Sequence, residues 1–225
     1  MAEISIFENI MKRNKKTALE NKKIIGKALA LNIMSSPGAG KTALLEKTFE
    51  YPGKKFKTGV IEGDVATSKD ANRLKKYGIN VYQIKTENYG GGCHLDARMV
   101  KKALPKVMKK PGAYDLIIIE NVGNLICPAD FDLGEDKKVV VLSVTEGEEK
   151  PLKYPLMFEI ADLMLLNKTD LLPHLDFDVE KLKKNVKKVN KRLRMIEVSA
   201  KDGTGIKEWT GILEKWIRQK RKKGK

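Results

Sequence analysis

The chain has few cysteines and no long apolar run. Its 225 residues include two cysteines and two histidines, and aromatic residues make up 6% of the sequence. So few cysteines exclude a disulfide-stabilised scaffold and suit a reducing compartment. No apolar run approaches the ~20 residues that a membrane-spanning helix needs, and no apolar segment follows the basic residues near the start of the chain. We therefore expect a cytoplasmic protein with neither a signal peptide nor a membrane segment.

Acidic residues are scarce relative to basic ones. The chain has 29 Asp and Glu against 45 Lys and Arg, and its formal net charge is +16. An excess of this size is compatible with a nucleic-acid or anionic-membrane partner. Between residues 178 and 193, however, apolar residues recur at helical spacing and lysines fill the other positions, which indicates a solvated helix face. Residues 218–225 carry six more positive charges, and we expect them to form a disordered tail, for which a weak acidic partner is an alternative.

Short apolar runs rich in β-branched residues recur along the chain, and most of the gaps between them have helical periodicity. Strands that alternate with helices predict an α/β fold, with a mainly parallel central sheet and helices on both faces. Residues 1–28 are expected to form a helical N-terminal arm, and residues 29–217 a single domain. The predicted strands are residues 29–34, 58–61, 81–84, 116–119, 139–144, 163–166 and 195–198, and the predicted helices of the domain are residues 42–49, 68–77, 95–109 and 206–217.

A glycine-rich loop joins the first predicted strand to the first helix of the domain. Glycines let consecutive backbone N–H groups turn toward an anion, and the following helix adds the positive end of its dipole. In such a phosphate loop, Lys41 would reach the β- and γ-phosphates of a nucleotide, and the Thr42 hydroxyl would bind Mg²⁺. The usual pattern opens with glycine, and this loop has Ser35 there. The predicted nucleotide-binding residues of the loop are Pro37, Gly38, Ala39, Gly40, Lys41 and Thr42.

Two further strands end in acidic residues. Ligands of open α/β sheets bind at the carboxyl ends of the strands, so Asp64 and Glu120 are placed to hold Mg²⁺ directly or through water. Residues 120–123 (Glu-Asn-Val-Gly) have the form of a γ-phosphate sensor, in which Gly123 lends its N–H. We assign these three residues and Lys41 to catalysis. Slow intrinsic hydrolysis is expected, because asparagine rather than a water-positioning glutamine follows the sensor motif.

A guanine-reading loop follows another apolar strand. The Asp170 carboxylate can accept hydrogen bonds from both the ring N–H and the exocyclic amine of guanine, which adenine does not offer. Asn167 would tie the loops of the site together, and the stem of Lys168 would lie on the plane of the base. The motif is short, but its distance from the phosphate loop and a further Ser-Ala-Lys motif make it specific. The remaining residues assigned to the base pocket are Ser199, Ala200 and Lys201.

Both cysteines and one histidine lie between these motifs. Cys93 and His94 follow three glycines at the start of a predicted helix, whose N-terminus would lower a thiol pKa and favour the metal-binding thiolate. Cys127 lies seven residues after Glu120, in the segment that a γ-phosphate sensor would move. Three ligands are too few for a closed structural zinc site, so two copies meeting across a two-fold axis would complete or pair such sites. From spacing alone, two buried cysteines and a capping histidine remain the alternative.

Several stretches together resemble the HypB family of GTPases, which help to deliver nickel to nickel–iron hydrogenase. They are residues 61–64, 93–97, 120–128 and 143–148, and the resemblance runs from about residue 20 to residue 217. It implies a P-loop NTPase fold of the branch shared with signal-recognition GTPases, dimerisation with GTP, and a metal site in the GTPase domain. The family's ligands match Cys93, His94 and Cys127, with Ni²⁺ or Zn²⁺ as the ion.

By the same analogy, the partners are a second copy of the chain, a nickel-delivery protein and the hydrogenase large subunit, and neither a membrane nor nucleic acid. The resulting interpretation is a GTP-hydrolysing nickel metallochaperone that uses GTP and Mg²⁺. GTP would order residues 120–127 and align Cys127 with Cys93 and His94 at the dimer interface. Residues 1–28 contain neither cysteine nor histidine, so the N-terminal nickel motifs of some family members are missing and tight nickel storage is not expected.

Three alternatives stay open. A urease-type nickel GTPase has a similar motif set, but its cysteine and histidine are separated by one residue, whereas Cys93 and His94 are adjacent. A basic GTPase that binds RNA or ribosomes would use the excess of lysine and would leave the cysteines unexplained. A non-enzymatic carrier of nickel or zinc would bind metal without GTP turnover.

Overall fold

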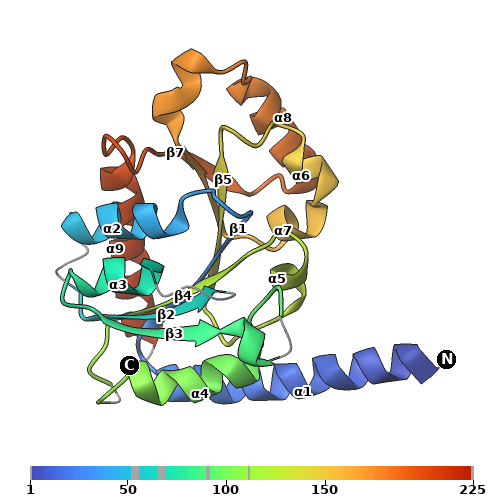
Figure 1. Ribbon diagram of the computed structural model, residues 1–225, viewed down its shortest axis with the longest axis vertical. Helices are drawn as coiled ribbons and strands as arrows, with labels where there is room; N and C mark the ends of the chain where they lie inside the picture. The colour runs from blue at the N-terminus through green and yellow to red at the C-terminus, as the bar shows by residue number, and fades with distance from the viewer. Residues whose placement is uncertain (1, 52–55, 65–68, 90–91, 111, 224–225) are drawn as a thin grey trace.

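The computed structural model describes residues 2–51, 56–64, 69–89, 92–110 and 112–223. Within these residues, seven parallel strands form one sheet in the order β3-β2-β4-β1-β5-β6-β7 (Figure 1). The strands are β1 (Leu29–Ser35), β2 (Thr58–Asp64), β3 (Asn80–Lys85), β4 (Leu116–Gly123), β5 (Lys137–Ser143), β6 (Leu163–Asn167) and β7 (Arg194–Glu197).

The central strands are apolar on both sides because helices cover both faces of the sheet. Every residue of β1 and of β6 is buried. Successive side chains of a strand point to opposite faces. Leu29 and Leu31 therefore belong to the core cluster of one face, and Ala30 belongs to the cluster of the other. Double coverage explains why these strands read in the sequence as continuous apolar runs.

Three helices cover the first face. Their core contains Phe49 and Trp209, both almost fully buried. The Trp209 indole N–H donates to Thr48 Oγ1 at 3.0 Å, which satisfies the only polar atom of the ring. The helices are α2 (Lys41–Glu50), α3 (Lys69–Lys75) and α9 (Ile206–Lys223).

The second face is covered by two groups of helices, each with its own core cluster. The long α1 and α4 pack together under β4 and β2, and the shorter helices lie over β5 and β6 (Figure 1). These helices are α1 (Ala2–Ile25), α4 (Ala97–Val107), α5 (Cys127–Asp130), α6 (Lys150–Lys153), α7 (Pro155–Glu159) and α8 (Val179–Val189), and two 3₁₀ segments, η2 (Thr86–Tyr89) and η3 (Thr169–His174), complete the described elements.

The N-terminal arm is helical, as predicted, and its α1 extends beyond the body of the molecule (Figure 1). Two buried asparagines hold it in place. Asn21 Nδ2 donates to the carbonyls of Ala97 and Leu133, at 2.8 and 3.0 Å. Asn14 Oδ1 accepts from Ala97 N at 2.9 Å, and its Nδ2 donates to Asp132 O at 2.8 Å. The arm is therefore fixed to the start of α4 by directional polar contacts.

The predicted sheet is confirmed: each of the seven strands lies where an apolar run predicts it, and β2 and β4 run further, through Asp64 and Gly123. The lysine-rich helix face is confirmed in α8, where Leu182 and Val186 are buried. None of the described helices has a stretch long and apolar enough for the hydrocarbon core of a bilayer. The first residue of the predicted helix 68–77 and residues 90, 91, 224 and 225 lie outside the described residues.

The prediction of a disordered basic tail is wrong for residues 218–223, because α9 continues to Lys223. Two basic residues of these last turns have carboxylate partners on other elements. Lys220 Nζ lies 2.6 Å from Asp136 Oδ1, and Arg221 forms an ion pair with Asp115. Ile217 is buried one turn earlier and anchors the same helix to the core. The sequence alone gave these charges no visible partners, since the two acids lie more than 80 positions away.

Candidate nucleotide and metal site

Because the strands are parallel, the sequence motifs lie at one edge of the sheet, at the carboxyl ends of β1, β2, β4 and β6. The phosphate loop connects β1 to α2 and contains two glycines with left-handed backbone, Gly38 (φ 74°) and Gly40 (φ 91°). A Cβ on Gly40 would lie 2.6 Å from Asn167 Nδ2. Position 40 therefore requires glycine both for its backbone conformation and for its close approach to the guanine motif.

The lysine of the loop points back over it. Lys41 is 9% exposed, and its Nζ donates to Ser35 Oγ at 2.8 Å. Ser35 Oγ in turn donates to Ser36 O at 2.6 Å. Burial lowers the pKa of Lys41, and the nearby Glu120 opposes that shift. Ser35, the residue that departs from the usual phosphate-loop pattern, thus holds Lys41 at the end of β1. A bound phosphate would replace Ser35 as the partner of Lys41.

The end of β4 touches the phosphate loop. A Cβ on Gly123 would lie 2.8 Å from Pro37 Cα and 2.9 Å from Pro37 N, which are both backbone atoms. Only a glycine fits this contact, because the backbone of the loop cannot rotate out of the way as a side chain would. The predicted sensor glycine is therefore packed directly on the loop that would bind the phosphates.

Two buried carboxylates lie next to the phosphate loop. Thr42 Oγ1 donates to Glu120 Oε1 at 2.7 Å. Glu62 stands opposite Glu120 on the neighbouring strand β2, and the two are 2% and 4% exposed. Oε2 of each is buried without a hydrogen-bond partner among the described residues. Burial raises the pKa of both carboxyls, that of Glu62 to about 8, with the charge of Glu120 adding to the shift.

Unpartnered carboxylate oxygens beside a threonine hydroxyl fit a magnesium ion, which prefers oxygen ligands. Sequence reasoning assigned Glu120 and Asp64 to this site and missed Glu62. Asp64 lies at the very end of β2, half-buried, and its carbonyl is 3.5 Å from Thr86 Oγ1. Glu62 lies in the same strand as Asp64, two residues earlier and on the same face. Only the register between β2 and β4 shows that Glu62 is the acid opposite Glu120.

The guanine motif is tied to the phosphate loop as the sequence predicts. Asn167 Nδ2 donates to Ala39 O at 2.9 Å, and Asn167 Oδ1 accepts from Ala200 N at 3.3 Å. Lys168 Nζ donates to Gly38 O at 2.8 Å. Lys168 has φ 62°, and no other described residue except glycines has positive φ. This strained backbone carries the lysine over the loop.

The carboxylate of Asp170 is held in place by two residues of the Ser-Ala-Lys motif. Its Oδ1 accepts from Ser199 Oγ at 2.8 Å, and its Oδ2 lies 3.7 Å from Lys201 Nζ. Ser199 Oγ also accepts from the backbone N–H groups of Lys201 and Asp202, both at 3.2 Å. The Ser-Ala-Lys motif at residues 199–201 therefore orients the Asp170 carboxylate of the guanine motif.

The two cysteines and His94 lie together in one chain. Cys93 Sγ is 2.8 Å from Cys127 Sγ, and the ligand atoms of Cys93, His94 and Cys127 all lie within 4.8 Å of one another. The alternative of two buried cysteines and a capping histidine is wrong, because Cys93 is exposed, Cys127 is half-buried, and the helix is capped by Asp96. No second protomer is needed to bring the three side chains together.

The local structure around these ligands differs from the prediction in one respect. The helix begins at Ala97 rather than Leu95, and Asp96 is its N-cap, with Oδ1 accepting from Met99 N at 2.8 Å. Cys93 therefore lies in the preceding loop, three residues before the N-cap, and not at the helix N-terminus where the sequence placed it. The pKa of Cys127 is raised, mainly by its hydrogen bond with Cys93.

His94 is suited to act as a neutral ligand. Its ring stacks on Phe131 with centroids 4.0 Å apart and an interplanar angle of 21°. Burial lowers the pKa of His94, so the imidazole is neutral near pH 7. Two thiols and a neutral imidazole form a donor set that fits nickel or zinc.

The buried side-chain amide of Asn121 connects β4 to the loop that contains Cys93 and His94. Asn121 follows Glu120 in β4 and is 1% exposed. Its Oδ1 accepts from Leu95 N at 3.1 Å and from Val122 N at 3.0 Å, and its Nδ2 donates to Asn32 Oδ1 at 3.2 Å. Leu95 follows His94 directly. Sequence reasoning gave Asn121 no role, because nothing in the sequence shows which loop its side chain reaches.

The sheet, the phosphate loop and the motifs at the strand ends define a P-loop nucleotide-binding protein. The chain matches the family model of the CobW/HypB/UreG nucleotide-binding domain over residues 29–197, and it belongs to this family, within its HypB branch.

Known proteins similar to this chain agree with that assignment. The hydrogenase maturation factor HypB of Azotobacter vinelandii is 52% identical over 215 residues, which cover 94% of this chain and 69% of that protein. The crystal structure of HypB from Helicobacter pylori in complex with nickel has a TM-score of 0.84 at 38% identity and covers 92% of this chain and 96% of that one. The Helicobacter pylori (strain J99) protein named hydrogenase/urease maturation factor HypB is 40% identical, with 94% of this chain and 87% of that protein covered.

Proposed function

We propose that this chain is a GTP-hydrolysing nickel metallochaperone that helps to insert nickel into nickel–iron hydrogenase. The observation that carries the proposal is the position of Cys127. Its Sγ lies 2.8 Å from Cys93 Sγ, in one group with His94, and it follows the proposed magnesium ligand Glu120 by only seven residues. The similarity to hydrogenase maturation factors, one of them solved with nickel, supports the same conclusion.

The nucleotide would occupy the loop between β1 and α2. Backbone N–H groups of the loop and Lys41 bind the β- and γ-phosphates, and Asp170 reads the guanine base. Thr42, Glu120 and either Asp64 or Glu62 would hold Mg²⁺, which when bound neutralises phosphate charge and orients the γ-phosphate. The N–H of Gly123 reports the γ-phosphate, and its contact with Pro37 transmits displacement of the loop to the end of β4.

Two connections would couple this event to the metal. The first is the chain itself, since residues 120–127 lead from the magnesium ligand to Cys127. The second is the hydrogen bond from Leu95 N to Asn121 Oδ1, which attaches the loop of Cys93 and His94 to the same strand. A change in the position of the β4 end therefore acts on all three metal ligands at once. Hydrolysis of GTP relaxes the segment and loosens the metal for transfer.

We extend the proposal to a GTP-dependent homodimer. Three ligands from one protomer leave at least one coordination position open, which a second protomer or a recipient protein can fill. The transfer partners proposed by analogy are a nickel-delivery protein and the hydrogenase large subunit. Both Ni²⁺ and Zn²⁺ suit the donor set, and nickel is proposed as the cargo because of the relatives' function.

The test is nickel affinity measured by equilibrium dialysis against a competing chelator, with the protein bound either to GDP or to a non-hydrolysable GTP analogue. We expect a difference between the two states, and equal affinities would contradict the coupling. Cys127→Ser should lower nickel affinity at least tenfold without changing nucleotide affinity. Ile126→Ser is a matched control, because Ile126 is 60% exposed in the same segment and supplies no ligand. Parallel dialysis with Zn²⁺ distinguishes the two metals.

Delivery to urease is a second candidate, favoured by the name of the Helicobacter pylori relative. Activation of the apo forms of a hydrogenase and of a urease by the nickel-loaded protein separates the two. A nickel-loaded dimer without GTP turnover would instead identify a non-enzymatic carrier.

A further inference from the structure

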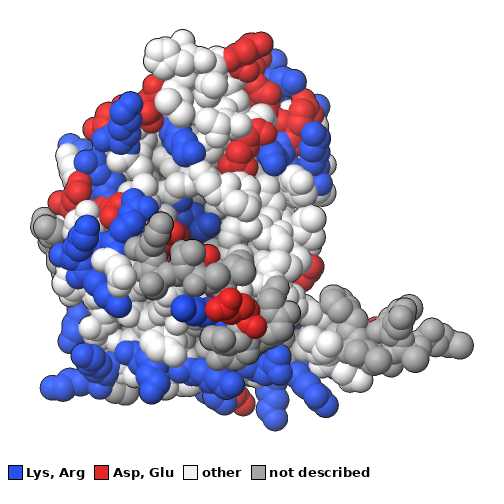
Figure 2. Space-filling model, in the orientation of Figure 1, with Lys and Arg blue, Asp and Glu red and all other residues white. Residues whose placement is uncertain are grey.

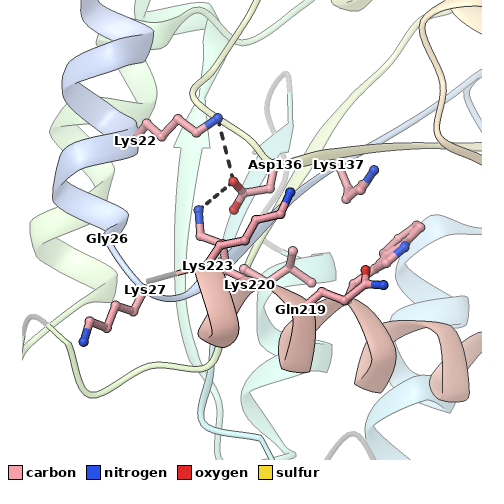
Figure 3. A pocket seen from close by; sticks show the side chains of 10 residues that line it. Lys22, Gly26, Lys27, Asp136, Lys137, Gln219, Lys220 and Lys223 are labelled. Atoms are coloured by element: carbon pink, nitrogen blue, oxygen red, sulfur yellow. Dashed lines mark hydrogen bonds and ion pairs between the residues drawn. The ribbon is translucent and has the colours of Figure 1, made fainter. Parts of the chain in front are cut away.

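A basic pocket of about 480 Å³ lies at the edge of the sheet opposite the nucleotide motifs (Figure 3). It forms where the C-terminal ends of α1 and α9 meet the first residues of β1 and β5. None of its lining residues belongs to the proposed nucleotide or metal site. Its charged lining residues are Lys22, Lys27, Asp136, Lys137, Lys220 and Lys223.

The single carboxylate of the lining is already engaged. Asp136 Oδ2 accepts from Ala30 N at 3.0 Å, which fixes the acid to the sheet. Its Oδ1 lies 2.6 Å from Lys220 Nζ and 3.8 Å from Lys22 Nζ, and Figure 3 shows these two lysines converging on it from α9 and α1. Asp136 therefore does not neutralise the charges of the other lysines of the pocket.

The remaining charges do not balance. Lys137 Nζ is 2.5 Å from Asp162 Oδ1, on the rim of the pocket. Lys27 and Lys223 are exposed and have no ion-pair partner in the described part of the chain. The ends of α1 and α9 that point here carry about half a negative charge each, which offsets about one lysine. Five lysines against two carboxylates and two helix ends thus leave an excess of about two positive charges.

The geometry favours carboxylates over a compact phosphate. Phosphate is usually held by a helix N-terminus, a cluster of backbone N–H groups or the fork of an arginine. Here both helices present their carbonyl ends, and none of the described lining residues is an arginine. Lysines on long stems are point charges that match carboxylates spread along a chain.

The pocket also offers an apolar surface. Trp216 lines it, half-buried, with its ring 6.3 Å from that of Trp209 at a steep angle. Lys137 Nζ lies 5.5 Å from the Trp216 ring centroid, and Leu29 contributes at the base. A small anion has no apolar group to bury against this surface, whereas an apolar side chain of a peptide can pack on it.

We propose that this pocket binds an acidic segment of a partner protein, with carboxylates at Lys27 and Lys223 and an apolar side chain against Trp216. Figure 2 shows further Lys and Arg side chains along the lower border of that view, over α1 and α4, which would steer an acidic partner toward this side. Because the pocket lies at the amino ends of the strands, a partner docked here leaves the nucleotide and metal residues accessible.

The test uses a fluorescein-labelled peptide with three glutamates on each side of a leucine, measured by fluorescence anisotropy at low salt. We expect saturable binding that weakens as salt is added, and none for the peptide with glutamine in place of glutamate. Lys27→Glu combined with Lys223→Glu should weaken binding at least tenfold. Lys184→Glu combined with Lys191→Glu is the matched control, because it makes the same charge change on exposed lysines of or next to α8 and should weaken binding less than twofold.

Several results would overturn the proposal. Equal weakening in the two double variants would show that only overall charge matters. Tighter binding of pyrophosphate or of single-stranded RNA than of the peptide, lost in the Lys27 and Lys223 variant, would identify a different ligand. The glutamine versions of both double variants keep the test valid if a charge reversal impairs folding, with an expected loss of at least threefold at Lys27 and Lys223. Nucleotide affinity should not change in any of them, so this test fails or succeeds independently of the proposed function.

Discussion

Replacement of Gly123 by alanine isolates the contact between the sensor strand and the phosphate loop. No left-handed backbone is involved, because Gly123 is not among the glycines with positive φ. The cost therefore comes from the new methyl group alone, which would lie 2.8 Å from Pro37 Cα and 2.9 Å from Pro37 N. Ordinary contacts of a Cβ are at least 3.4 Å, so the phosphate loop must move by roughly half an ångström or more. Overpacking of this kind costs about 1–3 kcal/mol.

If that strain falls on the nucleotide-binding conformation of the loop, the affinity for GDP should drop between about fivefold and 150-fold. A titration with a fluorescent GDP analogue measures the drop, and a thermal melt shows how much of the cost appears as lost stability. Gly211→Ala is the matched control, since a Cβ there meets nothing within 4 Å and the residue lies inside α9. That variant should bind normally and gain about 0.5–1 kcal/mol of stability. A Gly123→Ala protein with unchanged affinity and unchanged melting temperature would refute the reasoning.

Three further predictions concern single side chains. Asp170→Asn should lower the preference for guanine over xanthine nucleotides by at least a hundredfold, measured by competition, because one acceptor becomes a donor. Asn121→Ala should destabilise the fold by about 1–3 kcal/mol in a denaturant titration, since the buried N–H of Leu95 loses its acceptor, and should reduce the difference in nickel affinity between GDP and GTP-analogue states. The pKa of Glu62 is raised to about 8, so the stability that its protonated form contributes is complete below about pH 4.5 and is lost progressively as the pH rises from there to about 8. Glu62→Gln should therefore have a higher free energy of unfolding than the unaltered protein, measured in chelator without nucleotide. The difference should grow from pH 5 to pH 8 and reach up to about 3 kcal/mol by pH 7. A difference that is constant with pH would contradict the pKa shift of Glu62.

The features that follow from neighbours in the sequence were predictable. The strands are visible as apolar runs, because both faces of the sheet are covered. The phosphate loop and the guanine motif are visible because each is a single continuous segment whose backbone and side chains act together. Even the tie between Asn167 and the phosphate loop was predictable, since parallel strands direct their carboxyl ends to one edge.

The features that depend on strand order were not predictable in the same way. Strand β4 lies between β2 and β1, although the three are separated in the sequence by long crossover segments. That order sets Glu62 opposite Glu120 and brings Asn121 to the loop that contains Cys93 and His94. At the opposite edge the C-terminal ends of α1 and α9 come together, so that Lys220 and Lys223, expected in a disordered tail, are part of a pocket.

The sequence by itself thus predicted the class of fold, the nucleotide motifs and three candidate metal ligands, Cys93, His94 and Cys127. Only the tertiary structure decided that one chain brings these three side chains together, with Cys93 Sγ and Cys127 Sγ 2.8 Å apart. It also decided that β4 contacts both the phosphate loop and the loop of Cys93 and His94. The physical reason is that strand and turn propensities act over a few residues. Contacts between segments more than 25 residues apart depend on the register of a sheet that forms only when the whole core packs.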